Sequence, residues 1–198
     1  MTGLSQLNFG WLIFALMLIR VIFIKRRLLG YLFDSIVVLF GFNLIKPLFI
    51  NNSFHFYQII IFLLMAILIF VLSTIATSHL RLTLAAIKEN VKILNYDFYK
   101  IILLHLATAL YEEVLWRAIF LVVLVEISGN YFAIISNSLL FAYWHKGQFI
   151  TWRHAAELSV FSILLASLFL LSHSLVLVVI VHMVRNILIE ITNYESTE

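Results

Sequence analysis

The sequence predicts an all-α protein that spans a membrane as a polytopic bundle of about seven or eight helices, and two observations support this fold class. First, 64% of the 198 residues are hydrophobic and 12% are charged, whereas ordinary globular domains are about 45–50% apolar and about 25% charged. Second, the apolar residues form runs between charged or turn residues, and a hydrocarbon core of about 30 Å needs about 20 apolar residues per helix. We therefore predict one integral membrane domain over residues 1–198.

The chain divides into seven predicted spans. These are about 9–24, 28–50, 56–78, 101–125, 131–145, 157–171 and 174–191. Residues 79–100 mix apolar and charged side chains at roughly helical spacing, which favours either an interfacial amphipathic helix or a solvated connector helix. A very short connection around Ser172 and His173 joins the last two spans. The polar residues of most interest lie in the core helices within 101–191.

The basic residues predict the orientation of the spans. Lys25, Arg26 and Arg27 follow the first span and no basic residue precedes it, which is the reverse of a secretory signal peptide. Residues 79–100 and 146–156 also carry Lys and Arg, whereas 51–55 and 126–130 carry neither. The positive-inside rule then places the N-terminus outside and the C-terminus in the cytoplasm. The Ile-, Phe- and Asn-rich composition favours a bacterial cell membrane.

The composition excludes several classes of site. The chain has no Cys, so disulfides, thiolate metal sites and a cysteine nucleophile are ruled out. The formal net charge is +3, but the basic residues are scattered rather than gathered into a stripe, so we expect no nucleic-acid partner. The lipid bilayer is the expected surrounding, and the sequence leaves the oligomeric state open.

Three ionisable residues lie in the middle of the fourth span, which is the strongest functional signal. Charged groups at a helix centre oppose membrane insertion by roughly 2.5–3.5 kcal/mol each unless they are paired. Glu113 and Arg117 are one helical turn apart, so they can pair within their own helix. Glu112 points about 140° away from Arg117 and must face another helix, a metal ion or water. The alternative is that all three groups only hold the bundle together.

Polar residues in two other spans are candidate partners for Glu112. His145 ends the fifth span, and His182 and Asn186 lie one turn apart in the seventh. Singly, each is also typical of an interfacial residue or an interhelical hydrogen bond. Together, a carboxylate, two imidazoles and an amide can activate water, with the imidazoles and amide binding a divalent metal or stabilising the oxyanion.

These residues resemble the motif set of the CAAX protease and bacteriocin-processing (CPBP, or Abi) family of intramembrane endopeptidases. The family pattern is Glu-Glu-x-x-x-Arg, then Phe-x-x-x-His, then His-x-x-x-Asn on successive core helices. Here it reads Glu112-Glu113 with Arg117, Phe141 with His145, and His182 with Asn186. The resemblance covers residues 101–191. Two features depart from the pattern: Ala118 stands where the family commonly has Gly, and the chain is short for the family.

The resemblance implies a CAAX prenyl protease-like hydrolase whose substrate is a membrane-associated peptide or protein. Glu112 would activate water together with His145, and His182 and Asn186 would complete the site, with Asn186 as oxyanion donor. Glu113 and Arg117 would support it. The cofactor would be one divalent metal, zinc, on Glu112, His145 and His182, or the mechanism would be metal-free. Bacterial members are linked to processing of small peptides or pheromones and to bacteriocin self-immunity.

Two other functions are compatible with these residues. A non-proteolytic immunity or scaffold protein would bind a partner through the same fold. A small ion-coupled transporter would also use intramembrane Glu and His, but it predicts an internal repeat and helices broken by Gly or Pro, and neither is visible in the sequence.

The remaining polar residues have simpler interpretations. Asp34 is expected to extend toward water at the cytoplasmic end of its span. His105, about 20° from the face of Glu112, is either a supporting residue or an interface residue. Arg185 would position a substrate carbonyl or pair with a Glu on another helix. Four further histidines lie in loops or at span ends and are expected to be solvated: His55, His79, His154 and His173.

Overall fold

The computed structural model describes residues 3–23, 27–50, 94–145 and 152–193, with scattered residues between 57 and 71. These ranges are helical apart from short turns, and none of them contains a strand, which confirms the all-α class. Six of the seven predicted spans fall on described helices. The predicted span 56–78 and most of the connector 79–100 lie largely outside the described residues, as do His55 and His79.

The chain forms two compact units. One consists of Met1–Asn52 and Glu112–Leu175, and the other of Ser53–Tyr111 and Val176–Glu198. The first unit holds α1 (Gly3–Phe23), α2 (Arg27–Ile50), the π-helix η1 (Val114–Leu121), α6 (Val122–Ser128), α7 (Asn130–Trp144) and α8 (Trp152–Ser172). Most of α5 (Leu94–Glu113) and of α9 (Leu175–Asn193) belongs to the second unit.

One glycine makes the turn between α6 and α7. Gly129 has a φ of 78°, in the region that favours glycine because it has no Cβ. Its N–H donates to the Val125 carbonyl at 2.9 Å, and its own carbonyl accepts from Ala133 N–H at 3.0 Å. The two helices therefore follow each other directly and pack together. The connection between α8 and α9 is also very short, as predicted, with His173 and Ser174 between the helices.

The π-helix η1 forms the centre of the first unit. It contacts α1, α2, α6, α7 and α8, and every residue from Leu115 to Leu121 is buried. The apolar pattern of the fourth predicted span does not indicate a π-helix; this stretch follows Glu112 and Glu113 directly and contains Arg117. π-Helical turns are rare and frequently occur at functional sites.

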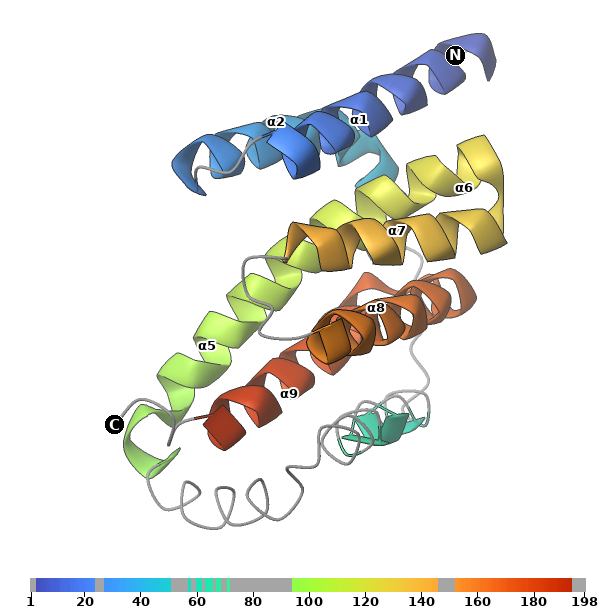
Figure 1. Cartoon of the computed structure of the whole chain (residues 1–198). Coiled ribbons are helices and arrows are strands. Elements are labelled where there is room, and N and C mark those ends of the chain that lie inside the picture. Colours follow the sequence, from blue (N-terminus) through green and yellow to red (C-terminus); the bar gives the residue numbers. More distant parts are fainter. Residues whose placement is uncertain are drawn as a thin grey trace. The chain divides into compact units, whose positions relative to one another are not determined.

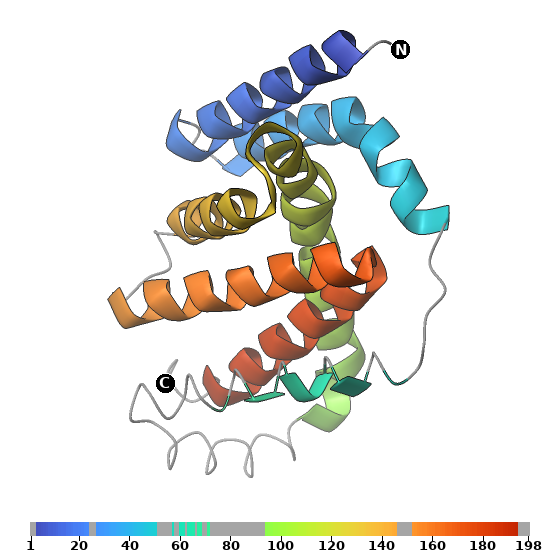
Figure 2. The same cartoon turned by 90° about the vertical axis from the view of Figure 1, so that its right-hand side faces the viewer.

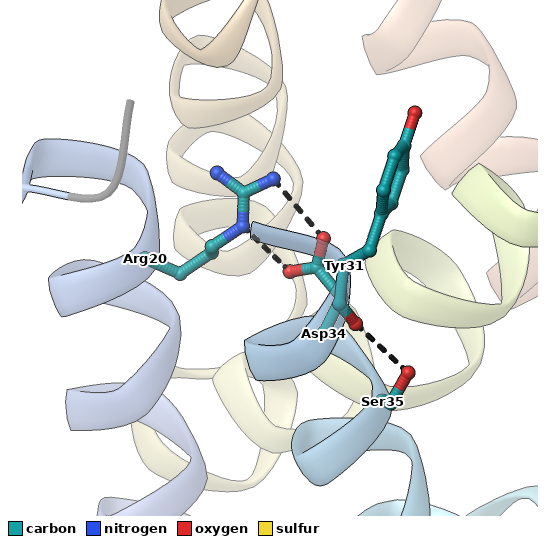
Figure 3. Close-up of polar contacts among 4 residues, drawn as sticks. All are labelled: Arg20, Tyr31, Asp34 and Ser35. Atoms are coloured by element: carbon teal, nitrogen blue, oxygen red, sulfur yellow. Dashed lines mark hydrogen bonds and ion pairs between the residues drawn. The ribbon is translucent and has the colours of Figure 1, made fainter. Parts of the chain in front are cut away.

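A buried ion pair joins α1 to α2, which lie side by side in both views (Figures 1 and 2). Arg20 Nε lies 2.8 Å from Asp34 Oδ1, and Arg20 Nη2 lies 3.1 Å from Asp34 Oδ2 (Figure 3). The prediction that Asp34 extends toward water is therefore wrong, because its side chain is 0% exposed. Arg20 supplies an opposite charge, and it donates inside the protein the hydrogen bonds that water would otherwise provide to the carboxylate.

One described helix is long and apolar enough to cross a membrane. It is the segment His154–Ser172 of α8, with a mean hydropathy of 2.0. Shorter apolar segments occur at Gly10–Phe23 and Leu28–Gly41. His154 and His173, at the two ends of α8, are exposed, as the sequence predicts.

Gly41 should be required for the contact between α2 and η1. A Cβ at Gly41 would lie 2.8 Å from two atoms of Ile119, whereas a Cβ at Gly10 would lie 3.8 Å from its nearest neighbour, Val123. We expect Gly41→Ala to destabilise the protein by about 1–3 kcal/mol, and the matched control Gly10→Ala to leave stability unchanged or slightly raised. Thermal unfolding in detergent measures both, and equal midpoints would contradict the close packing at Gly41.

Candidate active site

Arg117 is fully buried, and three side chains surround its guanidinium. Its Nε lies 3.1 Å from Glu113 Oε2, and both side chains are 0% exposed. The two atoms are close but not aligned as a hydrogen bond, so we describe the contact as an ion pair. Arg117 Nη2 donates to Ser162 Oγ on α8 at 2.9 Å. The guanidinium carbon lies 4.6 Å from the centre of the Phe141 ring, a cation–π distance.

The predicted pairing of Glu113 with Arg117 is therefore confirmed. A buried charge that loses its partner costs several kcal/mol, so this pair fixes the conformation of the first turn of η1. Because Arg117 also reaches Ser162 on α8 and Phe141 on α7, the same pair ties three elements together.

Glu112 turns to a different helix, as its position in the sequence predicts. Its Oε1 lies 3.6 Å from His145 Nε2, and the two side chains are 11% and 10% exposed. This separation is longer than a direct hydrogen bond. It is short enough for a charge interaction, or for one water oxygen or metal ion that both groups contact. The structure therefore brings together the first two residues of the predicted site.

The orientation of the His145 ring follows from the end of α7. Its Nδ1 lies 2.9 Å from the Phe141 carbonyl oxygen. A carbonyl oxygen only accepts, so Nδ1 carries the hydrogen and Nε2 is the atom that faces Glu112. The ring also packs against two aromatic rings, with centroid distances of 4.5 Å to Phe141 and 4.7 Å to Trp144. Phe141 thus accepts a hydrogen bond from His145 with its carbonyl and contacts the Arg117 guanidinium with its ring.

Asn137 is a buried polar residue of this unit that the sequence analysis did not single out. Its Nδ2 donates to the Trp116 carbonyl in η1 at 2.9 Å, and its side chain is 0% exposed. A buried backbone carbonyl needs a hydrogen-bond donor, and a side chain can provide one where the main-chain bond departs from α-helical geometry. Asn137 therefore supports the π-helical geometry of η1. The sequence feature that could have identified Asn137 is a polar amide side chain in the middle of the apolar span 131–145.

The other two predicted site residues lie on α9 in the second unit. His182 is buried, at 2% exposure, and Asn186 is partly buried. In the same unit, His105 on α5 interacts electrostatically with His182 and Glu190. Arg185 is buried on α9.

A metal site of three or more ligands is not assembled among the described side chains. Glu112 Oε1 and His145 Nε2 are nevertheless the two donor types that zinc commonly takes in proteins, and they face each other. These two donors fit part of the coordination expected for zinc.

Neutralising Glu113 should unfold the site by leaving Arg117 without its carboxylate. We expect Glu113→Gln to lower stability by about 3–5 kcal/mol, since breaking a buried ion pair on one side leaves an uncompensated charge. Glu126→Gln is the matched control and should have little effect, because Glu126 on α6 is exposed. Thermal unfolding of the purified variants distinguishes them. Equal midpoints would show that the ion pair is not needed for the fold.

Comparison with known families identifies the part of the chain that carries these residues. Residues 94–188 match the model of the family described as type II CAAX prenyl endopeptidase Rce1-like. The matched segment contains Glu112, Glu113, Arg117, His145, His182 and Asn186. No curated protein and no solved structure matches the chain significantly. The match over residues 94–188 confirms the resemblance found in the sequence.

Proposed function

We propose that the protein is an intramembrane endopeptidase in which Glu112 activates water for attack on a peptide bond. The observation that carries this proposal is the pair of buried Glu112 and partly buried His145, 3.6 Å apart, next to a second carboxylate that Arg117 already neutralises. Two adjacent carboxylates with different partners are suited to different tasks. Glu113 maintains the fold, and Glu112 performs proton transfer.

The geometry of His145 supports a water molecule shared with Glu112. Because Nδ1–H donates to the Phe141 carbonyl, the neutral ring offers a lone pair on Nε2. A water molecule donates one hydrogen to Nε2 and the other to Glu112 Oε1. It is then held with its oxygen lone pairs directed away from both groups, toward a substrate carbonyl carbon.

The reaction balances with these residues alone. Glu112 accepts a proton from the water, and the water oxygen forms a bond to the carbonyl carbon. The C–N bond then breaks, and the proton passes from Glu112 to the leaving nitrogen, which yields a carboxyl group and an amine. We assign His182 and Asn186 as the groups that complete the site, with the Asn186 amide donating to the oxygen that becomes negative.

A divalent ion such as zinc is an alternative occupant of the space between Glu112 and His145. Glu112 and His145 would hold it, with His182 as a further ligand by the family resemblance. Such an ion would polarise the substrate carbonyl and make water more acidic. Metal analysis of the purified protein, with and without chelator, distinguishes the two forms. A stoichiometric metal whose removal abolishes cleavage would contradict the metal-free mechanism.

The proposed substrate is a membrane-associated peptide or protein. The family description names a type II CAAX prenyl endopeptidase, so a farnesylated peptide with a CAAX-type C-terminus and an internal fluorescence quencher is the first probe. Membrane peptides from cells with and without the protein, compared by mass spectrometry, are the second. The second probe covers the small unprenylated peptides that we propose as bacterial substrates.

Replacing the proposed catalytic groups should remove turnover while substrate binding remains. We expect Glu112→Gln to abolish cleavage and Asn186→Ala to lower kcat by about 10²–10³-fold, the effect typical of losing one oxyanion donor. Both variants should retain the substrate peptide on purification, because these groups act on charge that develops in the transition state.

Glu126→Gln is the control for Glu112→Gln and should cleave like the wild type. Unchanged cleavage by Glu112→Gln would contradict the proposed base. If wild-type membranes yield no cleavage product while the triple variant Glu112→Gln/His182→Ala/Asn186→Ala still protects cells against a bacteriocin, the protein acts as an immunity factor and the endopeptidase proposal is wrong.

We also propose that the protein spans the bacterial cell membrane with its N-terminus outside and its C-terminus in the cytoplasm. The proposal rests on the positions of Lys and Arg in the connecting segments. A tag before Met1 should react with a membrane-impermeant reagent in intact cells, and a tag after Glu198 should react only after lysis. Both tags on the same side would contradict the proposed number of spans.

A further inference from the structure

The N-terminal helices contact the candidate active site through one charged residue. Arg20 on α1 lies outside the segment 94–188 that matches the family, yet its guanidinium carbon is 5.5 Å from the centre of the Trp144 ring. Trp144 precedes His145 and packs against it. We propose that Arg20, held by Asp34, is a positioning residue that fixes the His145 ring through Trp144. This inference rests on the proposed function of Glu112 and His145.

The structure holds the Arg20 guanidinium from two sides. Two parallel contacts to Asp34, of 2.8 Å and 3.1 Å, fix the plane of the group (Figure 3). Gly30 on α2 lets the group approach the helix backbone, since a Cβ there would lie 2.6 Å from Arg20 Nη2. Arg20 is 8% exposed and Asp34 is 0% exposed. The guanidinium therefore presents a fixed surface to Trp144.

Trp144 in turn forms one wall for His145. The two ring centroids are 4.7 Å apart, with an interplanar angle of 80°. His145 is the residue at which α7 ends, with φ −85° and ψ 6°, so helical backbone does not continue past it. Its orientation depends on the Nδ1 contact to Phe141 and on the Phe141 and Trp144 rings. A shift of Trp144 would let Nε2 move relative to Glu112.

The energetics of buried ion pairs separate a positioning role from a purely structural one. Replacing a whole buried pair by apolar residues of similar size is often neutral for stability. If Arg20 and Asp34 only stabilise the α1–α2 contact, the double variant Arg20→Met/Asp34→Leu should fold and cleave like the wild type. If they position His145 through Trp144, the same variant should fold but cleave slowly.

The test measures kcat, KM and thermal unfolding of the full-length protein with the peptide that the wild type cleaves. We expect Arg20→Met/Asp34→Leu to keep its unfolding midpoint and its KM, and to lose about 10- to 100-fold in kcat, as small misplacements of catalytic groups do. Arg20→Lys with Asp34 retained keeps a cation near Trp144 and should recover part of the loss. A folded double variant with wild-type kcat would overturn the proposal.

A double-mutant cycle tests whether Arg20 acts through Trp144. Trp144→Leu should lower kcat by a similar factor, and combining it with Arg20→Met/Asp34→Leu should add little further loss. Trp152→Phe, at an exposed residue, is the control and should leave kcat unchanged. Losses that multiply in the combined variant would overturn the proposal. If Arg20→Met/Asp34→Leu unfolds, Gly30→Ala is the substitute test, because the added Cβ displaces the guanidinium while both charges are kept. A wild-type kcat in Gly30→Ala would then overturn the proposal.

The tryptophan fluorescence distinguishes failure of this inference from failure of the proposed function. The chain has four Trp, so subtracting the spectrum of Trp144→Phe isolates the Trp144 emission. We expect this emission to shift in Arg20→Met/Asp34→Leu, because a positive charge leaves the face of the ring. If the wild type cleaves no peptide, the proposed function fails while a shifted emission still supports the Arg20 contact. An unchanged emission overturns that contact.

Discussion

Arg117 places a positive charge at a position with no solvent exposure, and the first unit is arranged around the groups that neutralise it. Glu113 supplies the opposite charge from one turn earlier, Ser162 on α8 accepts a hydrogen bond from the guanidinium, and Phe141 on α7 presents its ring. Each of these contacts fixes a different element against η1. Water cannot solvate a guanidinium in this position. The neighbouring helices must therefore pack so that their side chains supply its opposite charge and its hydrogen-bond acceptor.

The same arrangement explains why two adjacent glutamates have different surroundings. Successive residues of a helix point in different directions, so only Glu113 can share the face of Arg117. Glu112 is left on the side of α7, where His145 lies at the helix end with Nδ1 bonded to the Phe141 carbonyl. Phe141 contacts Arg117 through its ring and His145 through its backbone carbonyl. The spacing of Phe141 and His145 thus couples the buried ion pair to the Glu112–His145 pair.

The parts of this site that depend on helical spacing could be predicted from the sequence, and the parts that depend on contacts between helices could not. The i, i+4 relation of Glu113 and Arg117, and the exclusion of Glu112 from that pair, follow from periodicity alone and are confirmed. Asp34 was misinterpreted because its partner, Arg20, is 14 residues away on another helix. The π-helix was missed because Val114–Leu121 is apolar on all sides apart from Arg117, so its sequence contains no pattern that separates a wider turn from an α-helical one.

The family match covers part of the chain, and the structure adds contacts from helices outside it. The match begins at residue 94, whereas α1 and α2 supply Gly41 against Ile119 and the Arg20 guanidinium against Trp144. Contacts of this kind constrain shape and charge more than residue identity, because any helix pair that packs closely on η1 and places a fixed positive charge against the Trp144 ring would meet the same requirement. Motif residues such as Glu112 and His145 have no such freedom, since each contributes a particular atom. A family model therefore detects the residues that contribute atoms, and the helices that hold them in place become visible only in the packed structure.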